Sequence, residues 1–172
     1  DHDARQMCFS QAFRVMHVLP PINLRRTGRL YETILLGEHA QDVGGPYRES
    51  FVQYTMELQS GALPLLVRTP NGRHAVGQNR DKYLLNPGAN SLLHLEMLSF
   101  LGKLMGIAIR SKEYLALNIA PIIWKLLVGE TPTIEDLEAV DSSHQKSIKS
   151  IRNIDKQGID SETFAYSFFE TF

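Results

Sequence analysis

Apolar residues along the chain follow two periods, one typical of helices and one typical of strands. Residues 46–59 place large apolar side chains three or four positions apart, which predicts a helix with one buried face. This stripe consists of Tyr47, Phe51, Tyr54 and Leu58. Residues 30–36, 63–67 and 83–85 are short runs rich in aromatic, aliphatic or β-branched residues, so we expect them to be strands.

The residues before the first expected strand predict a helix over residues 4–19 and then a connector. One apolar face of this helix gathers Cys8, Ala12, Val15 and Leu19. Pro20-Pro21 ends the helix, because the residue before a proline disfavours helical angles, and residues 23–28 form a polar, basic connector. Further along, Pro70-Asn71-Gly72 carries the Asn-Gly signature of a β-hairpin, with residues 74–77 expected to return antiparallel.

Residues 91–111 predict the longest helix. Apolar residues nearly encircle its axis, which is typical of a helix in the middle of a domain. Gly102 and Gly106 lie four residues apart on this helix, where they would let another backbone pass close to it.

Three shorter helices are expected after it. The first lies within residues 115–129 and has Pro121 at its start. The second begins at Thr133, where Asp136 completes a start like a capping box, and Asp141 begins the third. Together the elements predict an α+β fold that is mainly α-helical with a few short strands.

Residues 37–51 switch abruptly from an expected strand to an expected helix. Gly44-Gly45 permits backbone angles closed to other residues, and Pro46 suits the first helical position. We expect Asp42 to accept backbone N–H bonds from this turn or from the helix start. A glycine pair before a helix is also a weak phosphate-binding signal, but this stretch lacks the Lys-Ser/Thr of a P-loop and the third glycine of a dinucleotide site.

The same stretch resembles the entry to the N-terminal lobe (N-lobe) of HECT-type ubiquitin ligases. The matching residues are Gly37, Glu38, Asp42, Gly44, Gly45, Arg48, Glu49 and Phe51. Further stretches match in the family's order, at residues 83–87, 98–108, 121–127 and 133–141. The resemblance covers residues 30–172, and the Gly-Gly-Pro-Tyr-Arg-Glu segment is most similar to the giant HERC-type members.

The resemblance implies that residues 1–29 lead into the domain and that residues 30–172 are the first part of a HECT N-lobe, mostly its large subdomain. HECT ligases accept ubiquitin from a conjugating enzyme (E2) as a cysteine thioester and transfer it to lysines of protein substrates. In the family the E2-binding subdomain and the catalytic cysteine come later. We therefore expect an inactive scaffold part of a longer E3 ligase. The alternative is a non-catalytic HECT-like protein-interaction module.

Composition excludes several other classes. The 172 residues are 43% hydrophobic and 22% charged with a net charge of −1, so no nucleic-acid partner is indicated. The most apolar stretch, residues 92–109, contains Glu96 and Lys103, which argues against a membrane span. One cysteine permits no internal disulfide, which suits a reducing, cytoplasmic location. The sequence carries no signal for an oligomeric state, although Phe164, Phe168, Phe169 and Phe172 would be exposed if the chain is a truncated piece.

Candidate chemistry is sparse, and we expect no catalytic, cofactor or metal residues in this chain. Cys8 is the one possible thiol nucleophile, but its apolar context favours a small buried filler, and a stand-alone cysteine hydrolase would need a His and an Asp or Asn beside it. The six histidines lack the spacing of a helical zinc site.

Two further features have structural explanations that need no site. The acidic cluster of Glu135, Asp136, Glu138 and Asp141 fits a solvated helix start, where carboxylates favour the positive end of the helix dipole. Trp124 is expected to be a core residue rather than a platform for a ligand.

Overall fold

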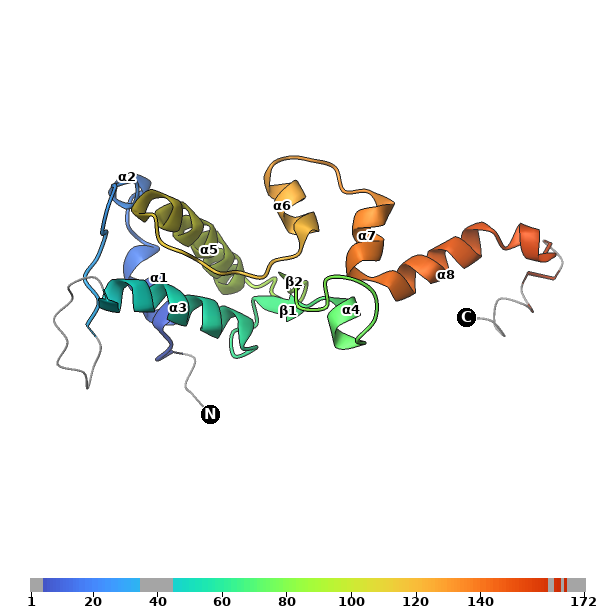
Figure 1. Cartoon of the computed structure of the whole chain (residues 1–172), viewed down its shortest axis with the longest axis horizontal. Coiled ribbons are helices and arrows are strands. Elements are labelled where there is room, and N and C mark those ends of the chain that lie inside the picture. The colour runs from blue at the N-terminus through green and yellow to red at the C-terminus, as the bar shows by residue number, and fades with distance from the viewer. Residues whose placement is uncertain (1–4, 35–44, 161–162, 165, 167–172) are drawn as a thin grey trace. The chain divides into compact units, whose positions relative to one another are not determined.

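The computed structural model describes residues 5–34, 45–160, 163–164 and 166 (Figure 1). The predicted fold class is confirmed, because these residues are mainly α-helical with two short strands. The elements are α1 (Cys8–Met16), α2 (Pro21–Leu24), α3 (Gly45–Gln59), β1 (Leu66–Arg68), α4 (Pro70–Arg73), β2 (Tyr83–Leu85), α5 (Leu92–Ser111), α6 (Pro121–Leu127), α7 (Ile134–Val140), α8 (Ser142–Arg152) and the short 3₁₀ helix η1 (Asp155–Gln157).

The described residues pack into two compact units. The first unit comprises the described parts of Asp1–Val67 and Tyr83–Ile119, and the second comprises those of Arg68–Lys82 and Ala120–Phe172. The two units are defined by how compactly the chain packs. They do not test the predicted boundary between residues 1–29 and residues 30–172, which stays a prediction.

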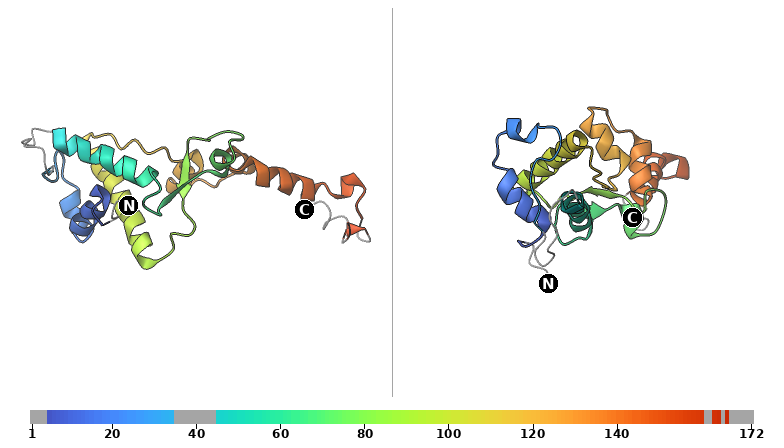
Figure 2. Two further views of the ribbon diagram at one scale, coloured as in Figure 1. Left: turned by 90° about the horizontal axis from the view of Figure 1, so that it is seen from below. Right: turned by 60° about the vertical axis from the view of Figure 1, so that its left-hand side comes forward.

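An apolar core holds the first unit together. Phe9 of α1, Phe51 of α3 and Phe100 of α5 are each fully buried, and the rings of Phe9 and Phe100 meet edge to face with centroids 5.5 Å apart. Figure 2 shows α1 and α3 side by side. The predicted stripe on α3 is confirmed, since its residues Tyr47, Phe51, Tyr54 and Leu58 are all buried.

Helix α1 is shorter than predicted, and its predicted apolar face is confirmed only in part, since Cys8, Ala12 and Leu19 pack partly buried against the core. Phe9 and Met16, seven residues apart, are buried, whereas Val15 of the predicted face is 67% exposed. The carboxylate of Glu57 fixes the start of α1 by accepting the backbone N–H of Cys8 at 2.8 Å and of Phe9 at 2.7 Å. The sequence pattern missed this register because the cap comes from α3, 48 residues away.

The strand predicted at residues 30–36 is absent from its described part, residues 30–34. Here a side chain rather than a backbone ladder anchors the segment. The Tyr31 hydroxyl lies 2.9 Å from Ser50 Oγ and accepts a hydrogen bond from the Tyr54 hydroxyl, and its ring packs 4.7 Å from that of Tyr47. The Gly-Gly turn is described only from Gly45, so Asp42 and its predicted cap lie outside the described residues.

The predicted connector at residues 23–28 begins within a helix. Pro21 occupies a first-turn position of α2, where a proline leaves no hydrogen bond unmade, so the Pro-Pro pair starts an element as well as following one. Helix α1 itself already ends at Met16.

The prediction of a β-hairpin at residues 70–77 is wrong. Thr69 accepts a hydrogen bond from the Gly72 N–H at 3.0 Å and so caps α4 in place of a turn. Strand β1 pairs instead with β2, the predicted strand at 83–85, and the bonds Thr69 N–H to Lys82 O and Asn86 N–H to Leu65 O make the pair antiparallel.

Helix α5 matches its prediction in extent but not in burial. Ser91 caps it, and six of its side chains reach the core. The side chains of its first turn are exposed to solvent, since Leu92 is 75% and Leu93 54% exposed. Among the described residues, α5 is the one helix with the length and apolar composition of a membrane span, and its buried face packs in the first-unit core. The close backbone approach predicted at Gly102 and Gly106 is not seen, because a Cβ at either would meet no described atom within 4 Å.

Polar side chains hold the second unit together. The core cluster of apolar residues belongs to the first unit, whereas the buried and hydrogen-bonded Thr69 and Asn71 lie in the second. The amide of Asn71 is central. Its Nδ2 lies 3.1–3.3 Å from the carbonyl oxygens of Gln78, Glu138 and Ala139.

The other end of the same amide binds the start of α8. Asn71 Oδ1 accepts the N–H of Ser142 at 2.8 Å and its Oγ–H at 2.9 Å. One side chain thus satisfies the last carbonyls of α7 and the first N–H of α8, groups that a helix cannot satisfy internally. Gly77 is required beside it, because a Cβ there would lie 2.7 Å from Asn71 Nδ2, and its φ is +62°.

The helix starts of the second unit confirm the sequence predictions. Pro121 begins α6, and Thr133 with Asp136 forms a complete capping box at α7. Asp141 caps α8 by accepting the His144 N–H at 3.1 Å. These signals are local in sequence, which is why they could be recognised without the fold.

Replacing Asn71 with Ala should lower the free energy of unfolding by about 3 kcal/mol, because it leaves buried carbonyls and the Ser142 N–H without partners. Urea denaturation followed by circular dichroism measures the change. Gln78→Ala is the matched control, since that side chain is exposed and only its backbone carbonyl is used. Equal stability of the two variants would contradict the central role of the amide.

Candidate functional site

The thiol of Cys8 lies half-buried at the start of α1, beside the carboxylate of Glu57. Burial and then the negative charge and hydrogen bonding of Glu57 raise the pKa of this thiol. A nucleophilic cysteine needs the opposite, a lowered pKa and a base positioned to take its proton. The expectation that Cys8 is a structural residue therefore agrees with its geometry, although the side chain is only partly buried.

The histidines do not form a metal site within the described part of the chain, where no group of three or more potential ligands comes together. His144 Nδ1 lies 2.6 Å from an oxygen of Asp141, which already caps α8. His2 and His39 lie outside the described residues.

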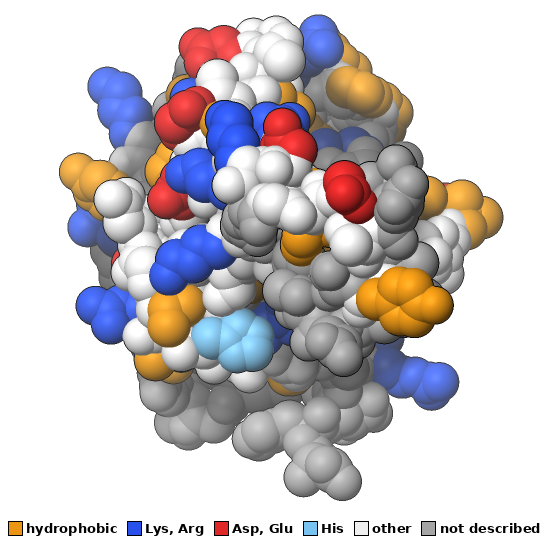
Figure 3. Space-filling model, turned by 90° about the vertical axis from the view of Figure 1, so that its right-hand side faces the viewer, with side chains coloured by type: hydrophobic (Ala, Val, Ile, Leu, Met, Phe, Trp, Pro, Cys, Tyr) orange, Lys and Arg blue, Asp and Glu red, His pale blue; other side chains and the backbone are white. Residues whose placement is uncertain are grey.

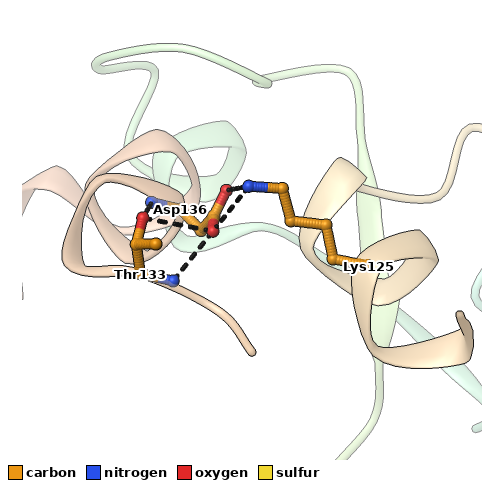
Figure 4. A network of polar contacts seen from close by, with 3 residues as sticks. All are labelled: Lys125, Thr133 and Asp136. Carbon is orange, nitrogen blue, oxygen red and sulfur yellow. Dashed lines mark hydrogen bonds and ion pairs between the residues drawn. The ribbon is translucent and has the colours of Figure 1, made fainter. Parts of the chain in front are cut away.

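The acidic cluster divides into separate structural roles. Asp136 accepts two hydrogen bonds from the ammonium of Lys125, at 2.8 and 2.9 Å, and one from the Thr133 N–H at 2.9 Å (Figure 4). These bonds, with that from Lys125 first, lower the pKa of Asp136. Glu138 pairs instead with Lys149 at 3.2 Å. The carboxylates thus complete helix starts and ion pairs, and they do not share one proton in a cleft.

The structure contradicts the expectation that Trp124, on α6, is a core residue. None of its residues is buried, and Trp124 is 43% exposed. The neighbouring apolar residues are exposed as well, namely Leu126, Leu127 and Val128. The sequence suggested a core residue because large aromatic side chains are usually buried, and it gave no sign that the side of α6 bearing Trp124 would stay uncovered by the described residues.

The described residues on the face drawn in Figure 3 give no sign of a polyanion-binding patch. On the face drawn in Figure 3 the described acidic and basic side chains are interspersed. Phe164 is 42% exposed, as expected, while Phe168, Phe169 and Phe172 lie outside the described residues. What the described residues offer is therefore surface for binding and packing, without an assembled catalytic group.

The sequence matches the model of a known protein family. A family model described as HECT-domain (ubiquitin-transferase) matches residues 52–172. The matched range lies within the resemblance seen in the sequence, which begins earlier, at residue 30.

This chain corresponds to a small part of the curated proteins named below. It is 42% identical over 151 residues to the E3 ubiquitin-protein ligase HERC2 of Mus musculus and to that of Homo sapiens. It is 37% identical over 122 residues to the probable E3 ubiquitin-protein ligase HECTD4 of Homo sapiens. These alignments cover 88% and 70% of the chain respectively, and each spans about 3% of the relative. The predicted likeness to HERC-type proteins is confirmed.

The thiol of Cys8 should titrate above its ordinary pKa, and Glu57→Gln should lower that pKa because it removes the adjacent negative charge. The rate of thiol modification by a disulfide reagent, measured from pH 7 to 10, gives the midpoint. Glu96→Gln, on the exposed side of α5, is the control. An unchanged midpoint in Glu57→Gln would contradict the electrostatic cause. A faster rate without a shifted midpoint would indicate loosening of α1 instead.

Proposed function

Because this chain belongs to the HECT-domain family, we propose that it is a scaffold part of the HECT domain of an E3 ubiquitin-protein ligase. The parent protein accepts ubiquitin from an E2 as a cysteine thioester and transfers it to substrate lysines. The observation that carries this proposal is the 42% identity to HERC2 over 88% of the chain, together with the family match over residues 52–172. Its partners in the parent are an E2, ubiquitin and protein substrates.

The chemistry needs a thiolate that this chain does not present. In the first step a cysteine thiolate attacks the carbonyl carbon of the E2-linked thioester, a new C–S bond forms, and the E2 thiolate leaves. In the second step a lysine amine attacks the new thioester, the amide forms, the amine loses a proton and the ligase thiolate leaves. Cys8, half-buried and with a raised pKa beside Glu57, is unsuited to the first attack.

Because Cys8 is unsuited to the attack, different parts of the parent protein are proposed to have different roles. Residues 1–29 lead into the domain, and residues 30–172 form the first part of the N-lobe. The E2-binding subdomain and the catalytic lobe come from other parts of the parent protein. A reducing, cytoplasmic location is consistent with a carrier cysteine that must stay reduced to react.

Helix α6 supports a scaffold role from the structural side. An amphipathic helix is stabilised mainly by covering its apolar face, yet Trp124, Leu126 and Leu127 remain exposed over one short helix. We propose that other parts of the HECT domain cover α6 in the parent protein. The ion pair of Lys125 with Asp136 joins α6 to α7, and the amide of Asn71 in turn holds the end of α7 to the start of α8.

Incubation of the chain with activating enzyme, E2, ATP and ubiquitin should give no ubiquitin adduct that a thiol reagent releases, as judged by non-reducing electrophoresis. The parent protein with its catalytic lobe should give one. Cys8→Ala is the control, because an adduct on the chain that disappears in this variant would contradict the scaffold assignment. A parent protein that forms no adduct would favour the alternative, a non-catalytic HECT-like interaction module.

A further inference from the structure

A pocket of about 280 Å³ lies in the first unit, between α1 and the first turns of α5. Phe13, Leu93 and Met97 contribute apolar walls. Its volume is slightly below the range of about 300–1,000 Å³ that is typical of small-molecule sites, and it suits one large side chain of a protein partner. Because every lining residue belongs to the first unit, its geometry is set within one compact body.

The apolar surface extends beyond the pocket. Leu93 is 54% exposed, and the nearby Leu92 and Leu95 are 75% and 53% exposed. These leucines occupy the first turns of α5, whose yellow-green end extends past the neighbouring helices in Figure 2. Several large aliphatic side chains together on one helix end mark an interaction surface more strongly than a single exposed leucine does.

The polar groups of the pocket carry positive charge or hydrogen-bonding capacity. The Nη2 of Arg14 donates to the backbone carbonyl of Arg5 at 2.8 Å, which holds the guanidinium at the pocket. Arg14 has no carboxylate partner among the described residues, so its remaining N–H groups can meet one from outside. The Nδ1 of His94 is buried and makes no hydrogen bond to any described atom.

Among the described residues that line the pocket none is acidic, whereas Arg14 and His94 lie there. An occupant complementary to this surface needs a large apolar group for the cavity and negative charge beside it. A nucleic acid would supply the charge, but it would place its backbone on an apolar lining with few cations to neutralise it. A peptide segment supplies both features at once, with one buried anchor and flanking carboxylates.

We propose that this pocket docks an acidic peptide segment of another protein, with a leucine or phenylalanine side chain in the cavity and an Asp or Glu on Arg14. The aliphatic residues at the start of α5 extend the contact on one side. The proposal does not depend on ubiquitin transfer, because it uses contacts within the first unit alone. In a protein-modifying enzyme such a site would hold a substrate or a regulatory segment.

The test is a selection of random 12-residue peptides displayed on phage against the complete 172-residue chain. The selected peptides should be rich in Asp and Glu around one Leu or Phe. Fluorescence anisotropy of a labelled selected peptide then measures affinity. Arg14→Glu and Leu93→Asp should each weaken binding by about tenfold or more, and the affinity should fall as salt is raised.

Matched variants keep the test specific. Arg26→Glu changes another exposed arginine, and Ile109→Asp changes a residue 80% exposed at the other end of α5. Both should bind the peptide within about twofold of the unmodified chain, and thermal melts confirm that all four variants fold. Selection of no binder, of basic or uncharged binders, or equal weakening by Arg14→Glu and Arg26→Glu would overturn the proposal.

Discussion

The second unit depends on one buried amide. Asn71 reaches the last carbonyls of α7 with its nitrogen and the first N–H of α8 with its oxygen, so the turn between these helices is fixed from a third element, α4. Few apolar side chains of this unit are buried to assist it. Stability here comes from satisfying polar groups at helix ends, where each unmade bond in a buried place is costly.

The first unit uses the opposite strategy and still contains one comparable polar contact. Its fully buried phenylalanines Phe9, Phe51 and Phe100 come from three helices and belong to one apolar core cluster. The carboxylate of Glu57 then sets where α1 begins, since it binds two consecutive backbone N–H groups. Burial of the Cys8 thiol, and after it the charge and hydrogen bonding of the same carboxylate, raise the pKa of that thiol and so disfavour its thiolate form.

The sequence predicted most where the determining contacts are local. The stripe on α3, the capping box at Thr133 and the N-cap at Asp141 involve residues three or four positions apart, and all were recognised. The failures have distant causes. The register of α1 depends on Glu57, and the Asn-Gly signal at Asn71 gave way to a helical turn because that amide is needed by α7 and α8.

The candidate surfaces were harder to foresee than the elements that carry them. The predicted absence of catalytic and metal residues in this chain stays a prediction, because some residues lie outside the described part. Exposure of α6 and of the first turns of α5 could not be read from their sequences, since an apolar helix looks the same whether it is covered or not. The pocket at Arg14 likewise depends on Leu63 and Met97 meeting α1 from separate parts of the chain.

The placement of Trp124 has a practical side. It is the single tryptophan of the chain, and it lies partly open to water on α6. Its indole emission therefore comes from one known position, on the helix that other polypeptide is proposed to cover. Assembly of a larger HECT domain around this chain would remove water from that ring and move its fluorescence to shorter wavelengths. The emission of Trp124 would therefore report when α6 becomes covered.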